Sequence, residues 1–326
     1  MSNLLFCINA VFPIILTVAL GYFLKRIGLI PISIVPSLNK LVFRIFLPIM
    51  LFLNVYGIES FSGMDMTFML YITVFTFAIF FITLPLVLLI TKDPSRRGPL
   101  HQGTFRSNYA FVGLPLSAAL CGEEGVIAAT VLSAVLVPLF NALAVVSLSI
   151  FKKDSKTPLI GRIFRDVIKN PLIQSIALGG VVLLIRYAFT RLDISFRLSD
   201  VTFVYKTLTS LSNLATPLAL IALGAQFEFS KTASMKKEIF FIVAIKGIIA
   251  PFLSLGIAYL LGCFAPAHFA CFIASFATPI SISSVPMTQE MGSDSTLAGQ
   301  LVIWTTVVSA FSIFLCTLVL RLLGIF

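Results

Sequence analysis

Two interrupted hydrophobic stretches decide the fold: His101-Gln-Gly-Thr-Phe-Arg-Ser-Asn-Tyr-Ala-Phe-Val-Gly-Leu-Pro-Leu116 and Phe272-Ile-Ala-Ser-Phe-Ala-Thr-Pro-Ile-Ser-Ile-Ser-Ser-Val-Pro-Met-Thr-Gln289. Each is apolar at both ends and carries polar residues and proline in the middle. A helix that faces lipid does not tolerate such a break, because no water is present to bond the freed backbone groups. Paired breaks at matching places in two halves of a chain are typical of the binding site of a secondary transporter.

The composition places the rest of the chain in a membrane. Hydrophobic residues make up 59% of the 326 residues, charged residues 11%, and the mean hydropathy is +1.06. A soluble domain carries roughly 25% charged residues. Apolar runs long enough to span a bilayer predict an all-α polytopic membrane protein with ten transmembrane helices. The expected spans are 4–24, 38–57, 67–91, 99–121, 125–151, 171–190, 205–227, 238–262, 265–291 and 296–324.

The net charge of +10 is explained by the position of the basic residues rather than by nucleic acid. If the N-terminus lies outside and ten helices alternate, most Lys and Arg residues fall on the cytoplasmic side, as the positive-inside rule requires. The expected location is therefore the cell membrane, with both termini extracytoplasmic. The cytoplasmic set is Lys25, Arg26, Lys40, Lys92, Arg96, Arg97, Lys152, Lys153, Lys156, Arg162, Arg165, Lys169, Lys231, Lys236 and Lys237. The outer set is Arg186, Arg191, Arg197, Lys206 and Arg321.

Motifs for catalysis, ATP hydrolysis and metal binding are missing from the sequence. It contains no GxxxxGK[ST], HExxH or GxSxG pattern, so we expect neither an enzyme nor an ATP-driven pump, and we expect no cofactor and no metal. The cysteines form no CxxC pair and are expected to be free thiols that act as small hydrophobic residues. They are Cys7, Cys121, Cys263, Cys271 and Cys316.

An offset of roughly 170 residues aligns the two halves of the chain. It places Pro48 opposite Pro217, the two interrupted stretches opposite each other, and Gly122 opposite Gly292. Five helices per half is an odd number, so the halves have opposite orientations, which defines an inverted repeat. We expect a first repeat over 1–151, a basic cytoplasmic linker over 152–169 and a second repeat over 170–326, with helices 4 and 9 broken and crossing.

The first break offers polar groups for a ligand. Pro115 removes a backbone donor and clashes one turn earlier, which frees carbonyl groups near Asn108 and Tyr109. The Asn108 amide can both donate and accept, and a half-helix that begins near Gly113 presents unpaired N–H groups that suit a carboxylate. A proline kink that neighbouring helices satisfy is the alternative for this segment.

The second break is a proline-bracketed cluster of hydroxyl groups. Pro279 and Pro286 enclose it, and a crossing of both breaks would bring four half-helix ends together near the membrane midplane. Single hydroxyls often bond to carbonyls of their own helix, but this explains a cluster less well. The hydroxyl residues proposed to bind substrate are Thr278, Ser281, Ser283 and Ser284.

Ionisable residues inside expected spans are functional hypotheses by default. Arg106, Lys246 and Glu290 are the candidates here, with roles in charge compensation or ion coupling. For Lys246 the alternative is a side chain that extends to the cytoplasmic surface. For Arg106 it is a structural clamp for loop carbonyls.

Several segments together resemble the auxin efflux carrier family, whose bacterial members are often labelled malate or malonate permeases. Arg106–Leu116 resembles the signature of the family's fourth helix. Four further segments resemble its second, seventh, ninth and tenth helices and cover the chain in order, namely Leu38–Pro48, Pro217–Gly224, Ala277–Met287 and Gly292–Ala298.

The resemblance implies the five-plus-five inverted repeat and a division into two parts. A scaffold of helices 1, 2, 6 and 7 would carry a mobile transport part of helices 3–5 and 8–10, and the protein would form a homodimer through the scaffold. Asn108 matches the crossover asparagine that touches the substrate carboxylate in the plant carriers. The second crossover differs, since Thr278 and Pro279 are followed by Ile280 and serines, and the long central loop of the plant proteins is reduced to a short linker.

These features predict a secondary transporter of small organic anions, mono- or dicarboxylates such as malate or malonate, that works by elevator-like alternating access. A proton or sodium ion is the expected coupling ion and membrane lipid the surrounding partner. The alternatives are a carrier of larger amphipathic acids, auxin-like or bile-acid-like, and a membrane receptor that binds an anion without moving it. A channel is disfavoured because the helices carry no rings of charge. Substrate identity, direction of transport and coupling ion stay open.

Overall fold

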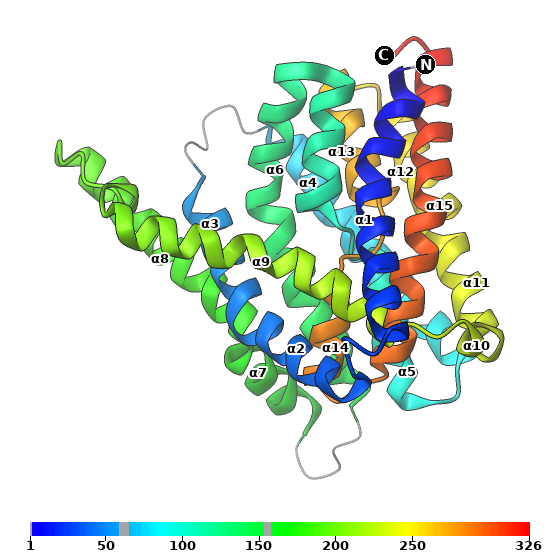
Figure 1. Cartoon of the computed structure of the whole chain (residues 1–326). Helices are drawn as coiled ribbons and strands as arrows, with labels where there is room; N and C mark the ends of the chain where they lie inside the picture. Colours follow the sequence, from blue (N-terminus) through cyan, green and yellow to red (C-terminus); the bar gives the residue numbers. More distant parts are fainter. Residues whose placement is uncertain (1, 59–64, 153–157) are drawn as a thin grey trace.

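A computed structural model describes residues 2–58, 65–152 and 158–326, with side chains from residue 12 onward. Every element along these residues is helical (Figure 1). The two chain termini lie at one end of the molecule, and α5, α7 and α10 lie at the other. The main helices are α1 (Ser2–Arg26), α2 (Val35–Leu41), α3 (Leu47–Tyr56), α4 (Met66–Ile90), α5 (Pro94–Phe105), α6 (Leu114–Ile150), α7 (Leu159–Lys169), α8 (Pro171–Arg191), α9 (Thr202–Gln226), α10 (Phe229–Thr232), α11 (Lys236–Ala244), α12 (Ala250–Leu261), α13 (Pro266–Phe276), α14 (Ser284–Glu290) and α15 (Ser295–Leu322).

Seven helical stretches among the described residues are long and apolar enough to cross a membrane. The expected all-helical, polytopic membrane protein is therefore confirmed at this level. Length and composition do not by themselves give the expected count of ten. Expected spans 99–121 and 125–151 contribute the single stretch Tyr109–Ile150, expected span 265–291 contains the shorter apolar helix α13, and α1 is not among the seven. The seven are Ile32–Tyr56, Met66–Ile90, Tyr109–Ile150, Pro171–Arg191, Thr202–Gln226, Phe229–Leu261 and Ser295–Leu322.

Side-chain caps set the beginnings of several helices. Asp65 accepts from the backbone N–H of Phe68 at the start of α4, and Asn170 accepts from Leu172 at the start of α8. At the start of α15, Asp294 accepts from Leu297 at 2.9 Å. Each cap satisfies an N–H group that has no partner within its own helix, so short polar residues between apolar runs define where the chain re-enters the apolar region.

Three π-helical turns share one cause. They are η2 (Val42–Phe46), η3 (Tyr109–Gly113) and η6 (Ile245–Ile249), and each ends two residues before a proline. Proline cannot donate to the carbonyl one turn earlier and its ring clashes there. The wider turn accommodates this, since the N–H after each π turn bonds to the carbonyl five residues back, as Leu114 does to Tyr109. Such turns are frequent at functional sites.

The two interrupted stretches cross and bond to each other. Between α5 and η3 the chain is extended at Arg106, and between α13 and α14 it is irregular from Ala277 to Ser283. Ser107 and Ile280 form an isolated antiparallel bridge, in which the Asn108 N–H donates to the Pro279 carbonyl at 2.8 Å. Backbone groups that neither half-helix can satisfy are thus paired between the two breaks, as burial requires.

The half-helix after the first break begins earlier than Pro115 suggested. The expectation was a half-helix that starts near Gly113, whereas helical structure resumes already at Tyr109. The physical reason is the π turn, which absorbs the proline without ending the helix. After it, α6 contains a second irregularity at Cys121 and Gly122, where Gly122 has φ +56°. This irregularity lies at the boundary between the expected spans 99–121 and 125–151.

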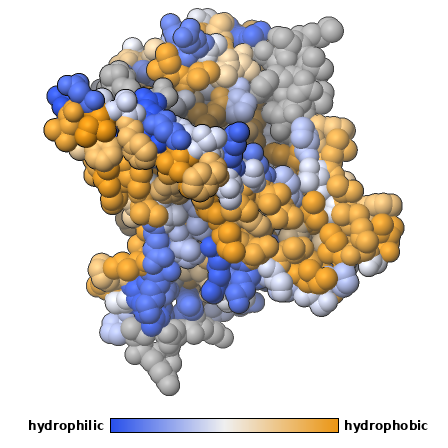
Figure 2. All heavy atoms as spheres, turned by 60° about the vertical axis from the view of Figure 1, so that its left-hand side comes forward, coloured by the Kyte–Doolittle hydropathy of each residue, from blue (hydrophilic) through white to orange (hydrophobic). Residues whose placement is uncertain are grey.

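The outer surface carries many exposed apolar side chains. Figure 2, which views the side on which α8 and α9 lie, shows broad hydrophobic areas. Leu178, Val181 and Leu184 of α8 are all exposed. α1 packs closely along α9, because Gly21 and Gly224 have no side chain where the backbone of the other helix passes. A surface of this kind suits contact with lipid.

The expected linker is partly helical. Residues 153–157, with Lys153 and Lys156, lie outside the described residues, as does the side chain of Cys7. From residue 159 onward the chain forms α7, an 11-residue helix that lies within the expected linker. Its Ile160, Phe164 and Ile168 are exposed at helical spacing. The other four cysteines are free.

Candidate functional site

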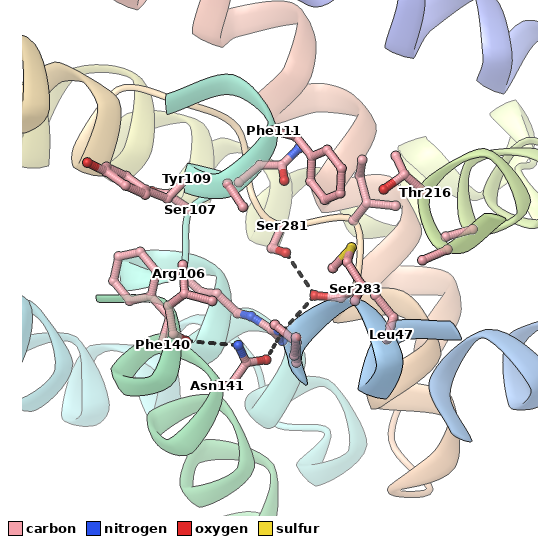
Figure 3. A pocket seen from close by; sticks show the side chains of 18 residues that line it. Leu47, Arg106, Ser107, Tyr109, Phe111, Phe140, Asn141, Thr216, Ser281 and Ser283 are labelled. Atoms are coloured by element: carbon pink, nitrogen blue, oxygen red, sulfur yellow. Dashed lines mark hydrogen bonds between the residues drawn. The ribbon is translucent and has the colours of Figure 1, made fainter. Parts of the chain in front are cut away.

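A small cavity lies where the first break meets α3 and α9. Its volume is about 40 Å³, which is room for a few water molecules. The break residues Arg106–Phe111 line one side, and Ser281–Ser283 line another. Apolar side chains of α3, α6 and α9 complete the wall: Leu47, Met50, Leu51, Val137, Phe140, Ala215 and Ala219. Figure 3 shows the polar groups of both breaks gathered on one side of this cavity.

The small cavity continues into a larger hollow of about 560 Å³. The two share several lining residues, among them Met50, Phe111 and Thr216. The hollow runs along the C-terminal half of α3 to Gly57 and Ile58. It is lined by apolar groups and by the polar side chains of Asn54, Thr130, Ser133, Ser212 and Asn213. A ligand therefore has more space on this side of the cavity than within it.

Arg106 is the charged group of the cavity. It is 1% exposed, and its Nη2 donates to Asn141 Oδ1 at 2.8 Å and to Ser283 Oγ at 2.7 Å (Figure 3). Nη1 donates to Gln102 Oε1 at 3.1 Å and contacts the sulfur of Met287. All of these partners are neutral side chains, so Arg106 is not a clamp for loop carbonyls. The guanidinium is a buried cation with no carboxylate beside it among the described residues.

The backbone of Asn108 is held by hydrogen bonds, whereas the side-chain nitrogen Nδ2 has no partner among the described residues. Its N–H donates to Pro279 and its carbonyl accepts from Val112 at 3.0 Å. The side chain is 2% exposed and lines the cavity, and its Nδ2 has no hydrogen-bond partner within the described residues. An unpartnered buried donor is costly and marks a position where a ligand acceptor would be stabilised.

The half-helix that starts after Asn108 has its first turn beside this cavity. Asn108 precedes the first helical residue, so the N–H groups of Tyr109, Ala110 and Phe111 precede the first intrahelical bond, which Val112 makes. These three residues all line the cavity. Helix starts carry a partial positive charge that favours an anion.

The hydroxyl residues separate into two groups. Ser281 and Ser283 line the cavity and bond to each other at 2.8 Å (Figure 3). Thr278 lies outside the cavity, just after the end of α13, and donates to the Ala274 carbonyl of that helix at 2.7 Å. Ser284 does not line the cavity either, and its buried hydroxyl has no partner among the described residues.

Tyr109 and Gly113 contribute to the support of the break. The Tyr109 ring is buried away from the cavity (Figure 3), and its hydroxyl donates to the Ala129 carbonyl at 3.2 Å. Gly113 packs against that ring, since a Cβ there would lie 2.9 Å from a ring carbon of Tyr109. Tyr109 lines the cavity although its ring points away from the other lining groups (Figure 3), and Gly113 is not part of the lining.

The three crossover prolines occupy different positions. Pro279 lies within the second break and accepts the bond from Asn108. Pro115 is exposed in the first turn of α6, after the π turn. Pro286 is buried within the first turn of α14.

Lys246 and Glu290 lie apart from the cavity. Lys246 is 3% exposed and its Nζ bonds to the Ser107 hydroxyl, so the side chain does not extend to a surface. Glu290, at the end of α14, pairs with Arg44 of η2 at 2.9 Å. Lys246 therefore contacts the first break from outside the small cavity, whereas Glu290 joins α14 to η2.

Asn141, Phe140 and Thr216 line the cavity although they were not among the expected site residues. Asn141 lies one turn after Pro138 in α6 and holds Arg106, and Thr216 directly precedes Pro217 in α9. A polar residue near a proline within a long apolar helix is the signal that could have pointed to both.

Two comparisons with known proteins show the family of this chain. The family described as membrane transport protein, the family of the auxin efflux carriers, matches residues 6–317. An uncharacterized transporter of Methanothermobacter thermautotrophicus is 21% identical over 328 residues, which cover 96% of this chain and 98% of that protein. With nearly its whole length matched, the chain belongs to the membrane transport protein family of auxin efflux carriers.

Proposed function

We propose that this protein is a secondary transporter of small organic anions, mono- or dicarboxylates such as malate or malonate. The single observation that carries the proposal is Arg106, a buried guanidinium that lines the cavity with only neutral partners. An isolated charge inside a membrane protein is costly unless a counter-charge is present. A carboxylate in the cavity supplies that counter-charge.

The groups around Arg106 fit one carboxylate group. The free Nδ2 of Asn108 and the N–H groups of Tyr109–Phe111 are donors, and Ser281 and Ser283 supply hydroxyls. The small cavity accommodates the charged head, and the hollow of about 560 Å³ accommodates the rest of the molecule. Arg and helix N-termini are suited to carboxylates in this way.

Alternating access would follow from the position of the cavity between two groups of helices. α3 and α9 belong to the proposed scaffold, and the two breaks belong to the proposed mobile part. The proposed ten-helix inverted repeat draws support from Gly122 and Gly292, which both adopt positive φ, +56° and +74°, at equivalent positions. An elevator-like shift would move the breaks along α3 and α9, with a homodimer formed through the scaffold.

Polar contacts close the side opposite to the hollow. Arg44 pairs with Glu290, Asn39 Nδ2 donates to Gln289 Oε1 at 2.8 Å, and Gln289 Nε2 donates to the Pro36 carbonyl at 2.9 Å. We call these contacts between the α2–η2 segment and α14 the latch. With the N-terminus outside, this is an outward-open arrangement in the cell membrane with the latch on the cytoplasmic side.

The hollow also favours a second candidate substrate class. Leu53, Val55, Phe111, Leu114 and Val137 contribute apolar surface to it, which suits a larger amphipathic acid with its carboxylate at Arg106. A size series of acids separates the two classes, because a small dicarboxylate would gain nothing from this apolar wall.

The test is uptake and binding with purified protein. Proteoliposomes loaded or supplied with radiolabelled malate, malonate and an indole acid measure flux, and calorimetry measures affinity in detergent. Saturable flux that Arg106→Gln abolishes supports transport of anions. Binding without flux identifies the receptor alternative, and absence of binding across all carboxylates contradicts the proposal.

A further inference from the structure

We infer that the Lys246 ammonium is a built-in cation at the crossing of the two breaks, in a position that a sodium ion from solution would fill if the ammonium were absent. The inference rests on the proposed function for its transport consequence, but its structural part stands alone. Lys246 lies in the π turn η6 (Ile245–Ile249) between α11 and α12, with 3% of its surface exposed.

The position of Lys246 is at the crossing of the two breaks. Its Nζ bonds to the Ser107 hydroxyl, and the Ser107 hydroxyl in turn bonds to the Ser275 carbonyl in the last turn of α13. Ser107 itself forms the backbone bridge to Ile280. One ammonium therefore joins both interrupted stretches through a single serine.

The surroundings of Lys246 are those of a cation site. α5 ends at Phe105 and α13 ends at Phe276, so the C-terminal ends of two half-helices meet near Ser107. Helix C-termini carry unpaired carbonyls and a partial negative charge, and such ends with unwound carbonyls coordinate the coupling ion in broken-helix carriers. Thr278, Thr305 and Ser309 surround the same space.

No other charge competes for this role within the described residues. Lys246 forms no ion pair there, and Glu238, the buried acidic residue on neighbouring α11, is paired with Arg96 at 3.2 Å. The space beside the lysine is too small for a water molecule. A sodium ion there would lie next to a like charge with no water to screen it, so sodium does not bind while the ammonium is in place. Ammonium and sodium are thus alternatives at one position.

Two consequences follow. The wild-type protein should bind substrate without sodium, because the stabilising cation is part of the chain. A variant that keeps the site but lacks the ammonium should gain a response to sodium. Lys246→Ala removes both the charge and the bulk, and it leaves the hydroxyls and half-helix ends in place.

The first experiment uses no substrate. Thermal unfolding of the detergent-solubilised protein is measured in NaCl and in choline chloride of equal ionic strength. We expect equal melting temperatures for the wild type in both salts, and a melting temperature of Lys246→Ala that rises with NaCl relative to choline. Lys237→Ala, at an exposed lysine of α11, is the matched control and should respond like the wild type. Stabilisation of the wild type by sodium, or identical curves of Lys246→Ala in both salts, would overturn the inference.

The second experiment uses malate or the best-binding carboxylate. Wild-type affinity should be equal in sodium and choline, Lys246→Arg should retain it within a few-fold, and Lys246→Met should lose at least tenfold although its volume is similar. If Lys246→Met binds the carboxylate as tightly as the wild type, the charge has no role in binding and the inference is wrong. This variant also provides a test if Lys246→Ala does not fold. If no carboxylate binds the wild type, the proposed function fails while the first experiment still decides the cation site.

Discussion

Arg106 and Ser283 are 177 residues apart in the chain, yet Nη2 of the arginine lies 2.7 Å from the serine hydroxyl. This contact joins the first break to the second at the wall of the cavity. Arg106 is the only charged side chain that lines the cavity among the described residues, and both interrupted stretches therefore determine its position. Displacement of either break would therefore change the position of the charge.

Arg106→Gln tests the charge of the cavity. The variant keeps a donor toward Ser283 and removes the uncompensated cation, so we expect the empty protein to stay folded. A hydrogen bond to a charged group is worth about 1.5–3 kcal/mol, which corresponds to about one to two decades of affinity. Calorimetric titration with malate measures the loss. Unchanged affinity would exclude Arg106 from the substrate site.

Asn108→Ala separates binding from stability. Because Nδ2 has no partner in the described structure, its removal costs no internal hydrogen bond, and the melting temperature should change by only a few degrees. Substrate flux into proteoliposomes should be lost, and affinity should fall by about one to two decades. A strongly destabilised variant would instead assign Asn108 a structural role, and ordinary transport would remove it from the site.

Pro115→Ala and Pro279→Ala test the broken helices themselves. Alanine at 115 restores an N–H that can bond to Phe111, which favours an ordinary helical turn over the π turn that places Tyr109–Phe111 at the cavity. Affinity should fall although no cavity side chain is altered. Pro85→Ala, at an exposed proline within α4, is the control. Equal substrate affinities in all three variants would show that the breaks are proline kinks and do not form a binding site.

The latch predicts a shift between conformations. Arg44 is 60% exposed, and exposed ion pairs contribute up to about 1 kcal/mol. The double variant Arg44→Ala, Asn39→Ala should therefore lower the ratio of outward-open to inward-open protein several-fold. A cysteine at Ser133, which lines the hollow, should react more slowly with a thiol reagent once the latch is removed. The comparison is the same cysteine in the intact latch, and an equal rate would show that these contacts do not hold the closed side.

Topology is tested with single cysteines in a cysteine-free background. Lys237→Cys and Ser199→Cys are at exposed positions on opposite sides in the proposed orientation. In intact cells an impermeant reagent should label position 199 and not position 237. Labelling of position 237 alone would reverse the orientation and place the termini in the cytoplasm.

The composition of the sequence and the positions of its polar and proline interruptions determined the class of the protein. Long apolar runs required helices, because a bilayer offers no other way to satisfy the backbone, and the breaks at Arg106–Asn108 and Ala277–Ser283 were visible as polar interruptions. The family resemblance rested on the same segments and is confirmed. Proline positions indicated irregular backbone, although the π turn before Pro115 moved the start of the half-helix to Tyr109.

The partners of each side chain were decided only by tertiary structure. Sequence placed Arg106 and Lys246 inside helices, but it could not show that Arg106 bonds to Asn141 and Ser283 or that Lys246 bonds to Ser107. Likewise, Ser281 and Ser283 line the cavity, while Thr278 bonds to a carbonyl of the preceding helix α13. The reason is geometric: in an irregular segment no periodicity relates position to direction. Only the crossing of the second break with the first sets which groups meet.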